Sequence, residues 1–276
     1  MLKIEAPPYI IAEAANNHGG SMLRALQLCD AAREAGADAV KFQLGLDRLC
    51  APTNRYYDTF KGVCLPYTEW YSIAKYCADT GIQFLASAFS LQAVAHLREM
   101  GVPVFKMASG DITYHSMLRS LSGDTVILST GGSDVDEIDE ALQVLGKDVY
   151  LLQCTMMYPC EDEDANVGGM ASLMERFGGC IKGVGYSDHT RTGKASVLAA
   201  EMGAMIVEKH FALEETDDSS CDPKTLDEMI KEIRDGYKLA DKLRNTLLGD
   251  AALGVKECER DVRKAARRNP RTGLRE

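Results

Sequence analysis

The stretch KGVGYSDHTRTGKASVLAAEMGAMIVEKHF, residues 182–211, contains the pattern that decides the fold. Starting one residue upstream, it consists of an apolar run at 181–186, a helical pattern at 193–203 and a second apolar run at 204–207. These segments predict a strand, a helix and a strand, and a polar tripeptide ending in histidine follows each strand. Strands joined by a crossover helix lie parallel, so their carboxyl ends meet at one edge and bring His189 and His210 together.

The two histidines predict a metal site. Neutral imidazoles that converge at one edge are natural ligands for a divalent metal. The alternative is that each is a hydrogen-bonded structural residue, which is the common role of an isolated histidine at a strand end. Their pairing, and polar neighbours such as Ser187 and Asp188, favour the metal site.

The alternation of strand and helix continues along the rest of the chain. Further strands are predicted at 9–12, 39–42, 83–86, 102–107, 126–128 and 149–154. Helices are predicted between them at 21–35, 68–79, 91–100, 114–121, 134–145 and 167–177, and a last one at 223–247. Ser21 is the predicted N-cap of the first helix, and Gly36 is its predicted stop.

Eight strands alternating with helices over about 250 residues predict an α/β fold of the (β/α)8 TIM-barrel type. The barrel domain is expected at residues 1–248, followed by a C-terminal basic tail or linker remnant at 249–276. An open doubly wound sheet is the alternative, but it needs fewer strands or a second domain.

Composition excludes several classes of protein. The 276 residues are 46% hydrophobic and 26% charged, as in a globular protein, and a net charge of −10 argues against a nucleic-acid partner. There is no signal-peptide core and no run of 18 apolar residues, so we expect a cytoplasmic protein without a membrane partner. Nine cysteines without a Cys-x-x-Cys pair are expected to be reduced.

Polar residues follow nearly every predicted strand, and in a barrel these strand ends form one rim. Lysines and serines dominate the set: Lys41, Lys106, Ser109, Ser129 and Ser187. With the backbone N–H groups of Gly110, Gly131 and Gly132, they predict a cradle for a small phosphorylated anion. Alternatively, Lys41 and Lys106 form buried structural ion pairs with Glu13 and Asp111.

Seven motifs carry a family resemblance. They are IAEAANNHGG, KFQ, FKMASGDIT, VILSTGG, LLQCTMMYP, GYSDHT and VEKHF, in that order between about Ile10 and Phe211. Together they resemble the sialic acid synthase family, the phosphoenolpyruvate-dependent synthases of nine-carbon 2-keto-3-deoxy sugar acids. The fold of that family is also a (β/α)8 barrel.

The resemblance implies a transferase of carbohydrate biosynthesis in which C3 of phosphoenolpyruvate attacks the aldehyde of an open-chain sugar. Water then adds at C2, and phosphate leaves by C–O cleavage. His189 and His210 would bind Mn²⁺ or Mg²⁺, and Glu13 would position the aldehyde. Asp111 and Tyr158 would face the reacting centre, and the phosphoenolpyruvate anion would be held by Lys41, Lys106, Ser109, Ser129 and Ser187.

Three departures from the family pattern lie on the acceptor side, where Asn17 is also expected. Met156 stands where a polar residue is usual, and the shorter loop FALEETDDSSCDP lacks the family's sugar-contacting aspartate unless Asp217 or Asp218 replaces it. The sequence ends at RRNPRTGLRE, where the family continues into a linker and an antifreeze-like domain that reaches the partner's site. We therefore expect an acceptor smaller or less polar than N-acetylmannosamine, and a possible homodimer resting on barrel contacts.

Two other functions stay open at this stage. One is a non-catalytic barrel that binds a phosphorylated ligand. The other is a metal-dependent aldolase or isomerase that does not use phosphoenolpyruvate. Release of phosphate during turnover distinguishes the synthase from both.

Overall fold

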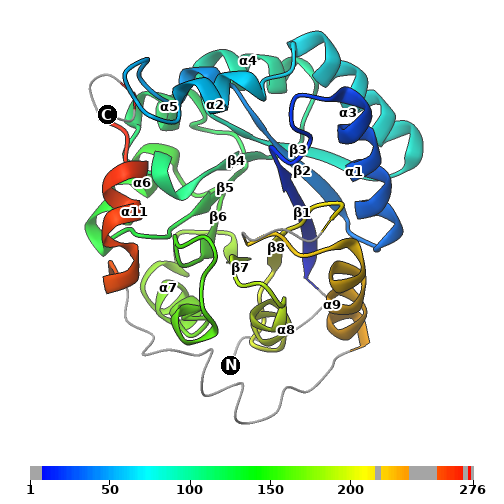
Figure 1. Cartoon of the computed structure of the whole chain (residues 1–276). Coiled ribbons are helices and arrows are strands. Elements are labelled where there is room, and N and C mark those ends of the chain that lie inside the picture. Colours follow the sequence, from blue (N-terminus) through cyan, green and yellow to red (C-terminus); the bar gives the residue numbers. More distant parts are fainter. Residues whose placement is uncertain (1–7, 215–218, 236–253, 270–272, 275–276) are drawn as a thin grey trace.

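The computed structural model describes residues 8–214, 219–235, 254–269 and 273–274, and it contains a closed parallel barrel (Figure 1). In the described chain each strand pairs with the next, and the eighth pairs with the first. The strands are β1 (Tyr9–Ala15), β2 (Ala39–Leu44), β3 (Gln83–Ala88), β4 (Phe105–Met107), β5 (Val126–Ser129), β6 (Val149–Gln153), β7 (Gly183–Asp188) and β8 (Ile206–His210). The predicted (β/α)8 barrel is confirmed.

Helices surround the barrel in the described residues (Figure 1). They are α1 (Met22–Glu34), α2 (Tyr57–Gly62), α3 (Tyr67–Thr80), α4 (Leu91–Glu99), α5 (His115–Ser120), α6 (Val135–Leu145), α7 (Gly169–Phe177), α8 (Lys194–Glu201), α9 (Pro223–Asp235) and α11 (Arg260–Ala266). Short 3-10 helices are η1 (Leu46–Arg48), η2 (Ser109–Asp111), η3 (Asp162–Asp164) and η4 (Glu257–Glu259). None of these described helices is long and apolar enough to cross a bilayer.

Local signals in the sequence explain several element boundaries. The Ser21 hydroxyl accepts a hydrogen bond from the N–H of Arg24, and Gly36 takes a φ of +83° after the helix, so both predicted ends of α1 are confirmed. β4 is shorter than predicted, because it begins at Phe105 rather than Val102. Pro103 has no N–H to donate to a ladder, so the strand starts after it.

The barrel interior is filled by alternate residues of the strands. One apolar layer consists of Ile11, Ala39, Leu85, Ile127, Leu152 and Ile206, each at most 5% exposed. Because side chains alternate along a strand, the next inward position lies two residues further toward the carboxyl end. Those positions carry polar side chains in most strands: Glu13, Lys41, Ser87, Ser129 and Glu208. A buried polar layer therefore lies directly above the apolar one.

The described part of the expected tail packs against the barrel. η4 and α11 follow one another near η2, which lies at the carboxyl end of β4. Hydrogen bonds join this segment to barrel loops: Glu259 accepts one from a backbone N–H group, and Arg267 and Arg268 donate to backbone carbonyl oxygens. The segment 254–269 is therefore part of the barrel's rim.

Candidate active site

Lys41 lies at the centre of the polar layer. Its Nζ is 2.5 Å from Glu13 Oε2 and 3.5 Å from Glu208 Oε2, and it donates to Ser87 Oγ over 3.0 Å. All of these side chains are buried. The ion pair between Lys41 and Glu13 that the sequence left as an alternative is thus present.

Lys106 approaches the same layer from β4. Its Nζ donates to Ser129 Oγ over 2.7 Å and lies 3.8 Å from Glu208 Oε1. Ser187 Oγ donates to that same oxygen over 3.0 Å. The Glu208 carboxylate therefore lies between the two ammonium groups.

Glu208 is absent from the site residues predicted from the sequence. The sequence contains a pattern that predicts it. Ile206, Glu208 and His210 are alternate residues of one short strand, so their side chains lie on the same face. Lys209, the neighbour of Glu208, points to the opposite side of the strand, where it donates to the carbonyl oxygen of Ser219 over 3.2 Å.

Burial and charge shift the pKa values of this layer. Burial raises the pKa of Glu13 to about 7, although Lys41 opposes the shift. Burial also favours the protonated form of Glu208, but Lys106 and Lys41 outweigh it and hold that pKa below its usual value. Burial lowers the pKa of Lys106. The layer thus carries a charged Glu208 and a Glu13 that exchanges its proton near neutral pH.

His189 and His210 lie above this layer, with ring centroids 5.2 Å apart. The Tyr158 ring packs against both, at 4.2 Å from His189 and 5.8 Å from His210. His189 Nδ1 is 2.6 Å from the carbonyl oxygen of Thr155, which accepts only if this nitrogen carries the proton. The lone pair of His189 is therefore on Nε2.

Both histidines are neutral at pH 7. Burial lowers the pKa of His189 to about 4 and the pKa of His210 well below its usual value. Two adjacent neutral imidazoles fit two coordination positions of a divalent metal. The described residues contain no group of three or more His, Cys, Asp or Glu side chains arranged to hold an ion.

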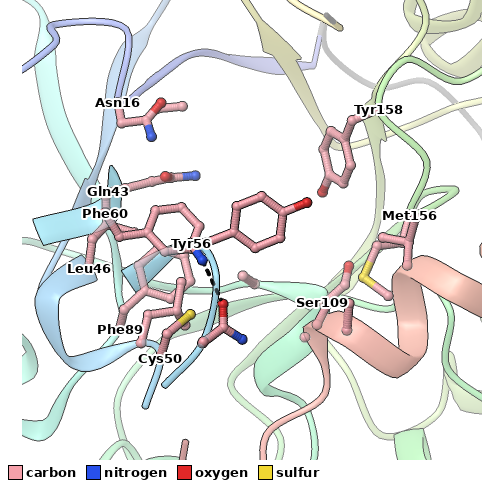
Figure 2. A pocket seen from close by; sticks show the side chains of 18 of the residues that line it. Asn16, Gln43, Leu46, Cys50, Tyr56, Phe60, Phe89, Ser109, Met156 and Tyr158 are labelled. Carbon is pink, nitrogen blue, oxygen red and sulfur yellow. Dashed lines mark hydrogen bonds between the residues drawn. The ribbon is translucent and has the colours of Figure 1, made fainter. Parts of the chain in front are cut away.

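A cavity of about 880 Å³ opens beside His210 at the barrel mouth. Figure 2 shows Tyr56 and Tyr158 entering it from opposite sides, with their hydroxyl groups directed toward one another. Part of its wall is apolar and includes Leu46, Leu49, Phe60, Phe89 and Met156, and a polar part includes Asn16, Asn17 and Gln43. The cavity is large enough for a sugar-sized ligand.

The other predicted residues are distributed unevenly. Ser109 lines the cavity, and Asn17 also lines it while donating to the carbonyl oxygen of Phe211 over 2.8 Å. Asp111 differs from expectation, because it is wholly buried and its Oδ1 lies 2.5 Å from Arg268 Nε. Arg268, and not Lys106, is therefore its ion-pair partner. Asp217 and Asp218 lie outside the described residues.

Two of the backbone N–H groups predicted to form an anion cradle are instead bonded within the protein. The N–H of Gly131 donates to Ser109 Oγ over 3.0 Å, and the N–H of Gly132 donates to Glu259 Oε1 over 2.6 Å. Both groups thus have partners within the chain. The donors that face the polar layer are side chains of Lys41, Lys106 and the nearby serines.

Comparisons with known proteins agree with this geometry. Residues 28–244 match the family model described as the NeuB family. The N,N'-diacetyllegionaminic acid synthase of Legionella pneumophila is 31% identical over 95% of this chain and 79% of its own length. Crystal structures of the spore coat polysaccharide biosynthesis protein SpsE of Bacillus subtilis and the N-acetylneuraminic acid synthetase of Leptospira borgpetersenii are also similar.

The SpsE structure superposes with a TM-score of 0.82 at 28% identity, covering 96% of this chain and 79% of that one. The Leptospira synthetase superposes with a TM-score of 0.77 at 29% identity, covering 93% and 90%. The family match spans well over half of the chain. This chain therefore belongs to the NeuB family, and it is an enzyme of the synthase class.

Proposed function

We propose that this enzyme condenses phosphoenolpyruvate with the aldehyde group of a sugar-like acceptor, giving a 2-keto-3-deoxy acid and inorganic phosphate. The proposal rests on one arrangement of side chains. The buried Lys41 and Lys106 share the carboxylate of Glu208, and the two neutral histidines lie directly above them, beside the cavity. Buried ammonium groups are costly unless anions pair with them, and Glu13 and Glu208 do so without a ligand. A bound phosphoenolpyruvate anion would use the same two ammonium groups. The synthases among the relatives support the same reaction class.

The lysines hold the charge of phosphoenolpyruvate in this proposal. Lys41 and Lys106 face its carboxylate and phosphate, and hydroxyl groups of Ser129, Ser187 and Ser109 add hydrogen bonds to the anion. During turnover the C2–C3 double bond of phosphoenolpyruvate supplies the electron pair for the new bond from C3 to the aldehyde carbon, and the aldehyde oxygen takes up a proton to become a hydroxyl group. Water adds at C2 and loses its protons. The C2–O bond to phosphate breaks, C2 becomes the keto carbon, and phosphate departs with the electron pair. The fixed ammonium groups stabilise the negative charge that develops on it.

His189 and His210 would hold the metal, Mn²⁺ or Mg²⁺, which when bound supplies Lewis-acid polarisation of the aldehyde. Glu13 is the register partner of His210 on the neighbouring strand. With a pKa raised to about 7, it can position the aldehyde and take up or release a proton there. Tyr158 packs on both imidazoles and restricts their orientation.

The apolar wall of the cavity supports a less polar acceptor than N-acetylmannosamine. Met156, only 2% exposed, adds to that wall and offers no strong hydrogen bond from its side chain. Hydroxyl groups placed against such a wall would lose hydration, whereas methyl or acyl substituents would pack there. We therefore propose an acceptor with deoxy or N-acyl positions. The cytoplasmic location of the enzyme and its assembly as a homodimer remain predictions from the sequence.

The test is phosphate release from phosphoenolpyruvate with Mn²⁺ or Mg²⁺ and a panel of aldehydes, from N-acylated and deoxy hexoses to small aldehydes. Release should depend on one acceptor, stop with a chelator and be lost in His189→Ala. Mn²⁺ binding, measured by equilibrium dialysis, should weaken in the same variant. His115→Ala, a half-buried histidine on α5, is the matched control and should change neither result.

Three results would contradict the proposal. Turnover undiminished by the chelator would remove the metal from the reaction. Binding of phosphoenolpyruvate without release across the panel would favour a non-catalytic barrel. Conversion of an acceptor without phosphate release would favour an aldolase or isomerase.

A further inference from the structure

The segment from Glu259 to Arg268 crosses the carboxyl-end rim of the barrel. At its start, the buried Glu259 carboxylate accepts hydrogen bonds from the N–H groups of Gly132, over 2.6 Å, and Met156, over 2.9 Å. Gly132 follows β5 and Met156 follows β6. One side chain therefore joins two of the loops that border the proposed phosphoenolpyruvate site.

Arg267 adds a third loop to this connection. Its guanidinium donates to the carbonyl oxygen of Ser109 over 2.5 Å and to that of Gly132 over 2.8 Å. It also donates to Ser133 Oγ and to Glu137 Oε2, at 3.0 and 2.9 Å. The planar fork of an arginine can satisfy several acceptors at once in fixed directions. Arg267 thus fixes the backbone of Ser109 relative to the loop after β5.

Arg268 holds the same turn from the other side. It is 3% exposed, and it pairs with Asp111 while donating to the carbonyl oxygen of Phe89 over 2.7 Å. Asp111 and Ser109 are the two ends of η2. The position of Ser109 is therefore set by both arginines, one on its carbonyl oxygen and one on the carboxylate two residues later.

The same segment also forms part of the cavity wall. Asp261, Val262, Ala265 and Ala266 of α11 line the cavity together with Ser109 and Gly110 of η2. The contacts of the arginines and the wall of the cavity thus belong to one continuous piece of chain.

We propose that residues 259–268 form a positioning strap, in which Arg267 and Arg268 hold η2 so that the Ser109 hydroxyl meets the phosphate of phosphoenolpyruvate. This inference rests on the proposed function, because it requires an anion at Ser109. The arginines touch no reacting atom and act through the backbone of η2.

The test measures phosphoenolpyruvate binding by calorimetry, together with the Michaelis constants for phosphoenolpyruvate and acceptor. Arg267→Ala should weaken phosphoenolpyruvate binding and raise its Michaelis constant on the order of 10- to 100-fold, with a smaller change in the constant for the acceptor. Arg267→Lys should lie between, because one ammonium group cannot reproduce the fork. Hydrogen exchange at residues 109–112 and 131–133 should become faster in Arg267→Ala.

Arg98→Ala is the matched control. Arg98 on α4 also binds a backbone carbonyl oxygen and a carboxylate, those of Ser120 and Asp124, but it lies outside the cavity wall. Its removal should change neither constant. For Arg268, Arg268→Met combined with Asp111→Asn avoids an unpaired buried carboxylate and should still weaken phosphoenolpyruvate binding.

The outcomes separate the two proposals. Unchanged phosphoenolpyruvate binding in Arg267→Ala, with the wild-type enzyme binding normally, would overturn the strap and leave the proposed function intact. Equal losses of affinity for both substrates, seen also in Arg98→Ala, would mean that the arginines only stabilise the fold. That result would also overturn the strap. A wild-type enzyme that binds neither phosphoenolpyruvate nor inorganic phosphate would overturn the proposed function and the strap with it.

Discussion

Replacing Glu208 by Gln removes the negative charge between the two buried lysines. The carboxylate lies 3.5 Å from Lys41 Nζ and 3.8 Å from Lys106 Nζ. At an effective dielectric constant of about 20, each attraction amounts to about 4 to 5 kcal/mol. Desolvation of the carboxylate offsets several kcal/mol of that sum, so Glu208→Gln should lower the free energy of unfolding by about 3 to 5 kcal/mol.

Urea unfolding of the wild-type and variant enzymes measures this difference, and the thermal midpoint should fall by roughly 10 °C. The matched control is Glu228→Gln on α9, an exposed carboxylate 3.6 Å from Lys224. It should change the free energy of unfolding by less than about 0.5 kcal/mol. A loss of under about 1 kcal/mol in Glu208→Gln would refute the role of Glu208 as the shared counter-charge.

The same variant tests which anion the lysines accept. Without Glu208, Glu13 is the carboxylate that remains beside the two lysines, so the layer has an excess of positive charge. Inorganic phosphate should therefore raise the thermal midpoint of Glu208→Gln more than that of the wild-type enzyme. An equal increase in both would mean that phosphate binds away from Lys41 and Lys106.

Three further predictions concern stability. Gly185→Ala should destabilise the barrel by at least about 1 to 3 kcal/mol in urea unfolding, because the added Cβ would lie 2.3 Å from the carbonyl oxygen of Ile206. Gly179→Ala is the control and should be well tolerated, because the space around Gly179 is open. Burial lowers the pKa of His18 from 6.5 to about 4. Between pH 6.5 and pH 4 the unfolded chain therefore binds a proton at His18 that the folded chain does not. The neutral His18 contributes about 3 kcal/mol to the free energy of unfolding; this contribution is complete above pH 6.5 and is lost as the pH falls to 4. An imidazole pKa above 6 in an NMR titration would contradict it. Asp134→Ala removes the capping box of α6 and should cost about 1 kcal/mol by thermal unfolding; an unchanged midpoint would show that the cap contributes nothing.

Much of the fold could be predicted from the sequence, because its signals are local. Apolar runs of strand length separated by helical patterns determined the order of the elements and hence the barrel. Ser21 and Gly36 marked the ends of α1 through the conformations that these residue types favour. The convergence of His189 and His210 followed in the same way, from two parallel strands with a histidine after each.

The partners within the site were decided by the tertiary structure. Asp111 has a suitable lysine five residues away in sequence, yet its partner is Arg268, 157 residues later. Glu259 likewise accepts a hydrogen bond from the N–H of Gly132, which was predicted from the sequence to bind a phosphate. Residue patterns within one segment determine which elements form and which face is buried. A long-range pair depends on where two distant segments meet, and only the closed barrel with residues 254–269 packed on its rim defines that.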